Sequence, residues 1–203
     1  MKALEALFLS IVAIILIALT LGSVDPSVIH IMAKAQTEER TTYSHQPEKA
    51  GQYTVTGEPT ITADFIDTVL CNHNSPACHT GYAMHSYGQQ YHIDPVYALA
   101  FFLHESTLGK YGVAHKNLGL GNIRCTAGYA CKSGFRAYSS WVTGYLDWYR
   151  LIDELYIKEW NLTTIDKIIP KYAPAADHNN ESAYIGAIKQ SVNLWRAGNP
   201  SIP

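Results

Sequence analysis

A run of apolar residues with one carboxylate near its end limits what this chain can fold into. Asp94 and Pro95 precede eight consecutive apolar residues, and Glu105 and Gly109 follow them. Asp is a favoured N-cap, Pro suits the first helical position, and Gly often stands just past a helix end. The run therefore predicts a helix from Asp94 to Leu108. A helix that is apolar on every face is typical of a buried position.

Two interpretations of Glu105 follow from this position. One is an ordinary glutamate in the last turn of a helix, exposed to water. The other is a glutamate that loses solvation at the end of a buried helix, which disfavours its charged form and raises its pKa. A carboxylic acid that stays protonated near neutral pH is able to protonate the leaving oxygen of a glycoside.

Length and composition indicate one folded domain. The chain has 203 residues, of which 47% are hydrophobic, which is enough for a real core. The net charge of −2 gives no basic surface field, so nucleic acid is not an expected partner. The 14 tyrosines suit carbohydrate surfaces and wet cores alike.

The N-terminal part reads as an export segment and a spacer. Lys2 precedes an apolar run from Ala6 to Leu21, and residues 33–35 offer a small-residue cleavage site. We expect residues 1–35 to be a signal peptide if they are cut and an N-terminal membrane anchor if they are not. Polar residues 36–59 then form a flexible linker, and 60–203 form the domain. The domain is expected to be a monomer, extracellular or in the cell envelope.

Four cysteines fall in two local pairs, Cys71/Cys78 and Cys125/Cys131. In an exported chain these pairs predict two disulfides with short loops. The alternative is zinc, because His73 and His79 stand beside the first pair, although the cysteine spacings differ from the usual metal knuckles. We therefore expect no metal and no cofactor.

Hydrophobic periodicity predicts about six helices around one core, a mainly α class. They are the helix after Thr62, Thr80–Tyr91, Asp94–Leu108, the helix capped by Ser139 or Ser140, a short helix from Thr163 or Thr164 that Pro170 ends, and the helix after Asn180. Glycine-rich residues 109–138 are expected to be non-helical, a loop or a small hairpin such as 125–131. Asp147, on the polar face of its helix, is expected to be solvated.

Four segments, in this order, resemble the bacterial glucosaminidase branch of the lysozyme-like superfamily, which also includes lytic transglycosylases. They are ALAFFLHESTLG at 98–109, NLGLGNIR at 117–124, FRAYSSW at 135–141 and KYAP at 171–174. The resemblance covers nearly the whole exported domain. It implies a lysozyme-like helical domain with a glycine-rich loop or small hairpin inserted after the catalytic helix.

The resemblance also implies roles for individual residues. Glu105 matches the family's catalytic acid, and Tyr172 matches a tyrosine of the active cleft that could hold the substrate's acetamido group or orient a water. Other matched motif positions are expected to bind substrate: Ser106, Gly121, Asn122, Ile123 and Tyr138. The implied substrate is a β-1,4-linked N-acetylated glycan, above all peptidoglycan.

A second acid is not found in any matched motif. Asp177, in the polar loop after Tyr172, is the best candidate from the sequence. The resemblance offers another route, in which the substrate's own N-acetyl group or 6-hydroxyl attacks. Two other functions stay open: a non-catalytic glycan-binding module of the same fold, and a structural envelope protein.

Overall fold

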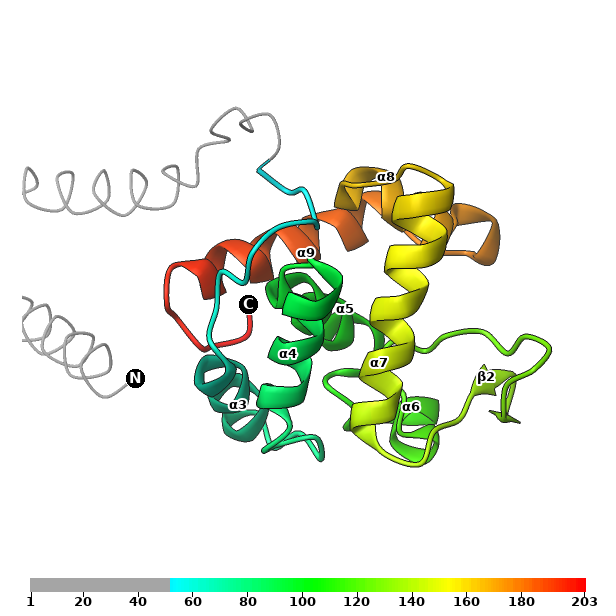
Figure 1. Cartoon of the computed structure of the whole chain (residues 1–203), viewed down its shortest axis with the longest axis horizontal. Coiled ribbons are helices and arrows are strands. Elements are labelled where there is room, and N and C mark those ends of the chain that lie inside the picture. Colours follow the sequence, from blue (N-terminus) through cyan, green and yellow to red (C-terminus); the bar gives the residue numbers. More distant parts are fainter. Residues whose placement is uncertain (1–51) are drawn as a thin grey trace, which may run out of the picture. The chain divides into compact units, whose positions relative to one another are not determined.

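Residues 52–203, the part of the chain that the computed structural model describes, are mainly helical and contain seven α-helices (Figure 1). They are α3 (Ala63–Asn72), α4 (Gly81–Tyr91), α5 (Pro95–Ser106), α6 (Gly112–Asn117), α7 (Trp141–Leu151), α8 (Ile165–Tyr172) and α9 (Glu181–Arg196). The mainly α class is confirmed. The predicted export segment, 1–35, lies outside the described residues. None of the helices between residues 52 and 203 has the length and hydropathy that a membrane crossing requires.

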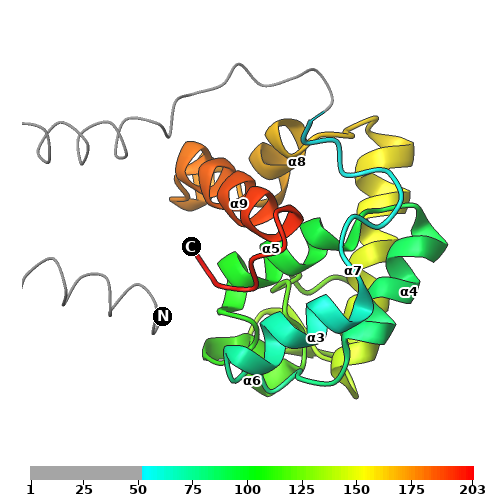
Figure 2. The same cartoon turned by 90° about the vertical axis from the view of Figure 1, so that its left-hand side faces the viewer.

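Helix α5 runs through the middle of the domain (Figures 1 and 2). It packs against α4, α6 and α9. Every residue from Pro95 to Phe102 is buried, as the apolar run predicts. Full burial of this stretch on all faces is possible because the helix satisfies its own backbone hydrogen bonds and its side chains are almost wholly apolar. The hydroxyl of Tyr97 is bonded to the Gln52 carbonyl and to Arg196.

The first turn of α5 is fixed by Asp94, the predicted N-cap. Its carboxylate accepts a hydrogen bond from the backbone N–H of Val96. It also accepts the Thr60 hydroxyl at 2.6 Å and the Arg196 guanidinium at 2.9 Å. This one buried side chain therefore ties the start of α5 to the segment before α3 and to the end of α9.

The last turn of α5 ends earlier than predicted. The helix stops at Ser106, and Thr107, Leu108 and Gly109 follow with φ of 50°, 56° and 79°. A β-branched residue such as Thr107 adopts this left-handed region only at some cost. The Ser106 hydroxyl holds the turn, since it donates to the carbonyl of Phe102 and accepts the N–H of Gly109.

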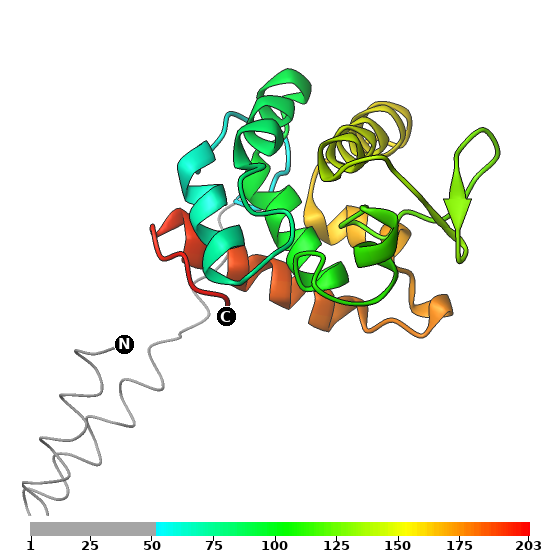
Figure 3. The same ribbon diagram turned by 90° about the horizontal axis from the view of Figure 1, so that it is seen from below.

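Residues 109–138 are less irregular than predicted. They contain helix α6, which the prediction missed, because Ala114 and Asn117 bury one side of a very short helix. The predicted hairpin exists but lies later, with β1 (Cys131–Lys132) antiparallel to β2 (Phe135–Arg136). Figure 3 shows this hairpin projecting from one side of the helices.

Helices α7 and α9 start where predicted, after the side-chain caps Ser140 and Asn180. A π-helix, Ile152–Glu159, continues α7, and a 3₁₀ turn, Ala175–Asp177, follows α8. Helix α8 does not end at Pro170 as predicted but continues to Tyr172. Burial of Ile168 and Ile169 holds this helix in place although Pro170 lacks a backbone donor.

The folded domain also begins earlier than the predicted boundary at residue 60. Tyr53 and Val55 are 7% and 2% exposed. The N–H of Val55 donates to the carbonyl of Thr163, and its carbonyl accepts the N–H of Asp94. Residues 53–59 were therefore wrongly assigned to the linker. They belong to the domain, because two apolar side chains in this mostly polar segment attach it to the core.

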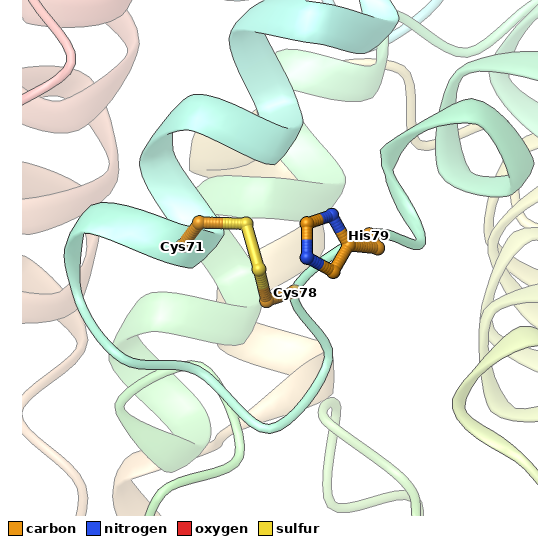
Figure 4. A group of neighbouring side chains, drawn as sticks. All are labelled: Cys71, Cys78 and His79. Atoms are coloured by element: carbon orange, nitrogen blue, oxygen red, sulfur yellow. A yellow bond between two sulfur atoms is a disulfide. The ribbon is translucent and has the colours of Figure 1, made fainter.

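Both predicted disulfides are confirmed, Cys71–Cys78 and Cys125–Cys131. Cys71 is in the last turn of α3 and Cys78 in the loop before α4, with His79 beside them (Figure 4). These three residues form a cluster of possible metal ligands among the described residues. Both sulfur atoms are bonded to each other, so neither is available as a thiolate ligand.

The prediction that Asp147 is solvated is wrong. Its side chain accepts hydrogen bonds from Arg136 at 2.9 Å, Tyr138 at 2.7 Å and Arg150 at 3.0 Å. Arg136 of β2 and the nearby Tyr138 enclose this carboxylate, so a position that is polar in sequence becomes part of a buried charge network. The Arg136 guanidinium also lies 3.5 Å from the centre of the Tyr129 ring.

We expect Asp147→Asn to lower the free energy of unfolding by about 3 kcal/mol, because Arg136 keeps its charge in a buried place without a counter-charge. Urea unfolding followed by circular dichroism measures the change. Asp166→Asn is the matched control, since Asp166 pairs with Lys189 and is 48% exposed. It should cost less than about 1 kcal/mol. Equal losses in the two variants would contradict the proposed importance of the buried pair.

Candidate functional site

Glu105 stands in the last turn of α5 with its side chain partly buried. The buried part of α5 precedes Glu105, and the turn held by Ser106 follows it directly. Burial raises the pKa of the Glu105 carboxyl, and two hydrogen bonds to its oxygens act in the opposite direction. Since desolvation is the larger effect, Glu105 holds its proton at higher pH than an exposed glutamate.

One of these bonds comes from Tyr184 on α9, whose hydroxyl donates to Glu105 Oε1 at 2.6 Å. Tyr184 is buried, 3% exposed, and is not among the site residues that the sequence analysis names. Burial keeps its pKa well above the ordinary value, so it remains a neutral donor. The sequence signal for this role is a tyrosine on the apolar face of a helix, because a buried hydroxyl needs a hydrogen-bond partner.

The other bond comes from Asn122, which lies in the segment after α6. Its Nδ2 donates to the backbone carbonyl of Glu105 at 2.7 Å and lies 3.4 Å from Glu105 Oε2. Asn122 adopts a left-handed conformation, φ 46°, that turns its side chain toward the end of α5. Of the residues predicted to bind substrate, Asn122 is the one that contacts Glu105 directly.

His104, next to Glu105, stacks on Tyr184 with the ring centres 3.7 Å apart. The histidine ring thereby holds the tyrosine that orients Glu105. Partial burial lowers the pKa of His104. The imidazole therefore stays neutral at lower pH than a fully solvated histidine.

Tyr172 ends α8, and its hydroxyl donates to the carbonyl of Gly121 at 2.5 Å. Gly121 has no room for a side chain, because a Cβ would lie 2.6 Å from the Trp148 ring and 2.9 Å from the Tyr172 hydroxyl. Tyr172 and Gly121 thus fasten the segment that carries Asn122. In this structure Tyr172 therefore has a supporting role, as a tyrosine bonded to a backbone carbonyl.

The remaining predicted residues lie around this centre rather than at it. Ser106 is buried and bonded within its turn. The Ile123 carbonyl accepts the N–H of Arg136, and the Tyr138 hydroxyl is bonded to Asp147. Asp177 makes an exposed ion pair with Arg124, 3.4 Å between the charged atoms.

A polar pocket of about 460 Å³ lies elsewhere, lined by Thr54, Thr60, Asp94 and Arg196 among others. Asp94 caps the first turn of α5, whereas Glu105 stands in its last turn. At a rise of about 1.5 Å per residue, the two ends of this helix are about 16 Å apart. The pocket is therefore separate from the surroundings of Glu105.

A comparison of the chain with models of known protein families finds no match, and a comparison with curated protein sequences finds none either. The site consists of one carboxyl group of raised pKa, held by donors from two distant segments.

We expect Tyr184→Phe to raise the pKa of Glu105, because the variant loses a hydrogen bond that favours the carboxylate. Carbon-detected NMR titration of the Glu105 carboxyl measures the shift without any activity assay. Tyr172→Phe is the matched control, since it removes a hydroxyl that bonds Gly121 instead. It should leave the Glu105 titration nearly unchanged and lower stability by about 1 kcal/mol. A larger shift in the control would show that Tyr172 governs the carboxyl.

Proposed function

We propose that this domain is an exported glycosidase of lysozyme-like type that cleaves a β-1,4-linked N-acetylated glycan, with peptidoglycan as its substrate. Glu105 is the general acid. The observation that supports this most is the partly buried carboxyl of raised pKa at the end of α5, held by Tyr184 and Asn122. The choice of substrate is supported by the four segments of the sequence that resemble the glucosaminidase family in the same order.

Glu105 has two oxygens with different tasks in this proposal. Oε1 accepts the short bond from Tyr184, so the acidic proton belongs on Oε2. The Asn122 contact with Oε2, at 3.4 Å, is too long to compete strongly for that oxygen. Oε2 then gives its proton to the glycosidic oxygen, and the leaving sugar departs as a neutral alcohol.

The positive charge that develops on the anomeric carbon needs a nucleophile. Among the described residues, the carboxylates of Asp94, Asp147 and Asp153 are buried in ion pairs. Asp177, the second acid predicted from the sequence, is paired with Arg124. Following the resemblance, we assign the nucleophile to the substrate, as its N-acetyl group in hydrolysis or its 6-hydroxyl in a lytic reaction. Mass spectrometry separates these outcomes, since hydrolysis gives reducing ends and the lytic reaction gives anhydro ends.

We expect Glu105→Gln to lower the rate of glycan cleavage by about 10²- to 10⁴-fold, because an amide has no acidic proton to give. Turbidity clearing of purified cell walls measures the rate, and a pull-down with the same walls measures binding. Retained binding without cleavage is the expected result. Binding without cleavage by the unmodified protein would instead support the glycan-binding module, and activity above a few tenths in the variant would exclude Glu105 as the acid.

We also expect Glu105→Gln to make the domain more stable at high pH. Because burial raises the pKa of Glu105, the folded state binds the proton more tightly than the unfolded chain does. Stability therefore falls as the pH rises through the folded-state pKa, and the variant avoids this loss. Urea unfolding should give the variant the larger free energy of unfolding at about pH 8, and this difference should shrink at about pH 4. A constant difference between the two would contradict the raised pKa.

A further inference from the structure

Arg124 and Asp177 extend from the same two segments that meet beside Glu105. Asn122, two residues before Arg124, contacts Glu105, and the segment is fastened through Gly121 to Tyr172. Asp177 follows Tyr172 by five residues, in the 3₁₀ turn Ala175–Asp177. Two extended residues span at most about 7 Å, so Arg124 begins within about one sugar ring of Asn122.

The ion pair between Arg124 and Asp177 is weak. It consists of one contact of 3.4 Å, and the side chains are 73% and 51% exposed. Exposed pairs of this kind contribute about 0–1 kcal/mol. The buried Arg136–Asp147 pair has the opposite character, with both side chains under a tenth exposed and 2.9 Å between the charged atoms. A competing anion can therefore displace Asp177 at little cost, and Asp177 then returns to water.

The Arg124 guanidinium is well placed to take such an anion. Of its five N–H donors, the contact with Asp177 uses a single nitrogen. Its plane is supported by the Phe135 ring, 5.6 Å from the ring centre, and this contact uses no N–H donor. A guanidinium with free donors binds a carboxylate through two parallel hydrogen bonds, which an exposed lysine cannot do.

We propose that Arg124 recognises a carboxylate carried by the glycan and that Asp177 occupies the guanidinium in the free protein. The proposal rests on the proposed function and names its substrate more closely, as an acidic glycan rather than a neutral one. In cell-wall glycans such a carboxylate is either the lactyl group of the sugar or a carboxyl group of the attached peptide.

Three substrates test this: peptide-free wall glycan, peptide-bearing wall glycan, and neutral β-1,4-linked N-acetylglucosamine oligomers. Arg124→Gln should lower the ratio of kcat/KM for acidic over neutral substrate about tenfold, mainly through KM. The fall should weaken as salt is added. Asp177→Asn should raise the same ratio severalfold, because it frees the guanidinium. If the ratio for Arg124→Gln falls with peptide-free glycan, Arg124 binds the lactyl carboxylate. If it falls only with peptide-bearing glycan, Arg124 binds a carboxyl group of the peptide.

Lys167→Gln is the control, because it removes the same charge from an exposed residue of α8. If Lys167→Gln lowered this ratio as much as Arg124→Gln does, the effect would come from the loss of any positive charge, and the proposal would be overturned. An unchanged ratio in Arg124→Gln, with all substrates still cleaved, would overturn it while leaving the proposed function intact. Failure of the unmodified protein to cleave any of the three substrates would refute the proposed function and this inference together.

Discussion

The burial of residues 95–102, the first two-thirds of α5, is the constraint on which the rest of the structure depends. A helix surrounded by other helices carries its last turn out of the core, and a glutamate placed there loses part of its hydration. Burial of the apolar run and the raised pKa of Glu105 are therefore two results of one arrangement. Asp94 fixes the other end of the helix, so the position of Glu105 depends on a network about 16 Å away.

Phe101, one turn before Glu105, links the packing of the core to the geometry of the site. Its ring contacts Trp148, Tyr172 and Tyr184, with centres 5.4, 5.1 and 5.7 Å away. Tyr184 holds Glu105, and Tyr172 holds the segment of Asn122 through Gly121. One aromatic side chain therefore positions both groups that orient the carboxyl, which a polar residue at this place could not do without partners of its own.

The ion pairs of the described residues differ in burial. The pair of Arg136 with Asp147 is enclosed, and the pair of Arg196 with Asp94 has a buried carboxylate; both connect distant elements. The pair of Arg124 with Asp177 is open to water and close to the site. Enclosed pairs are costly to break because they leave a charge without hydration, whereas open pairs exchange readily. The first two pairs serve the fold, and the third is available to a ligand.

Local patterns in the sequence determined the helices with clear caps, the central position of α5, the two short-range disulfides and Glu105 as the candidate acid. Each depends on residues close together in the chain, where spacing limits the geometry. Only the tertiary structure decided that Tyr184, 79 residues from Glu105, bonds its carboxyl, that Asp147 is buried, and that Asp177 meets Arg124. These contacts join elements whose approach is set by packing, so no local period or cap reveals them.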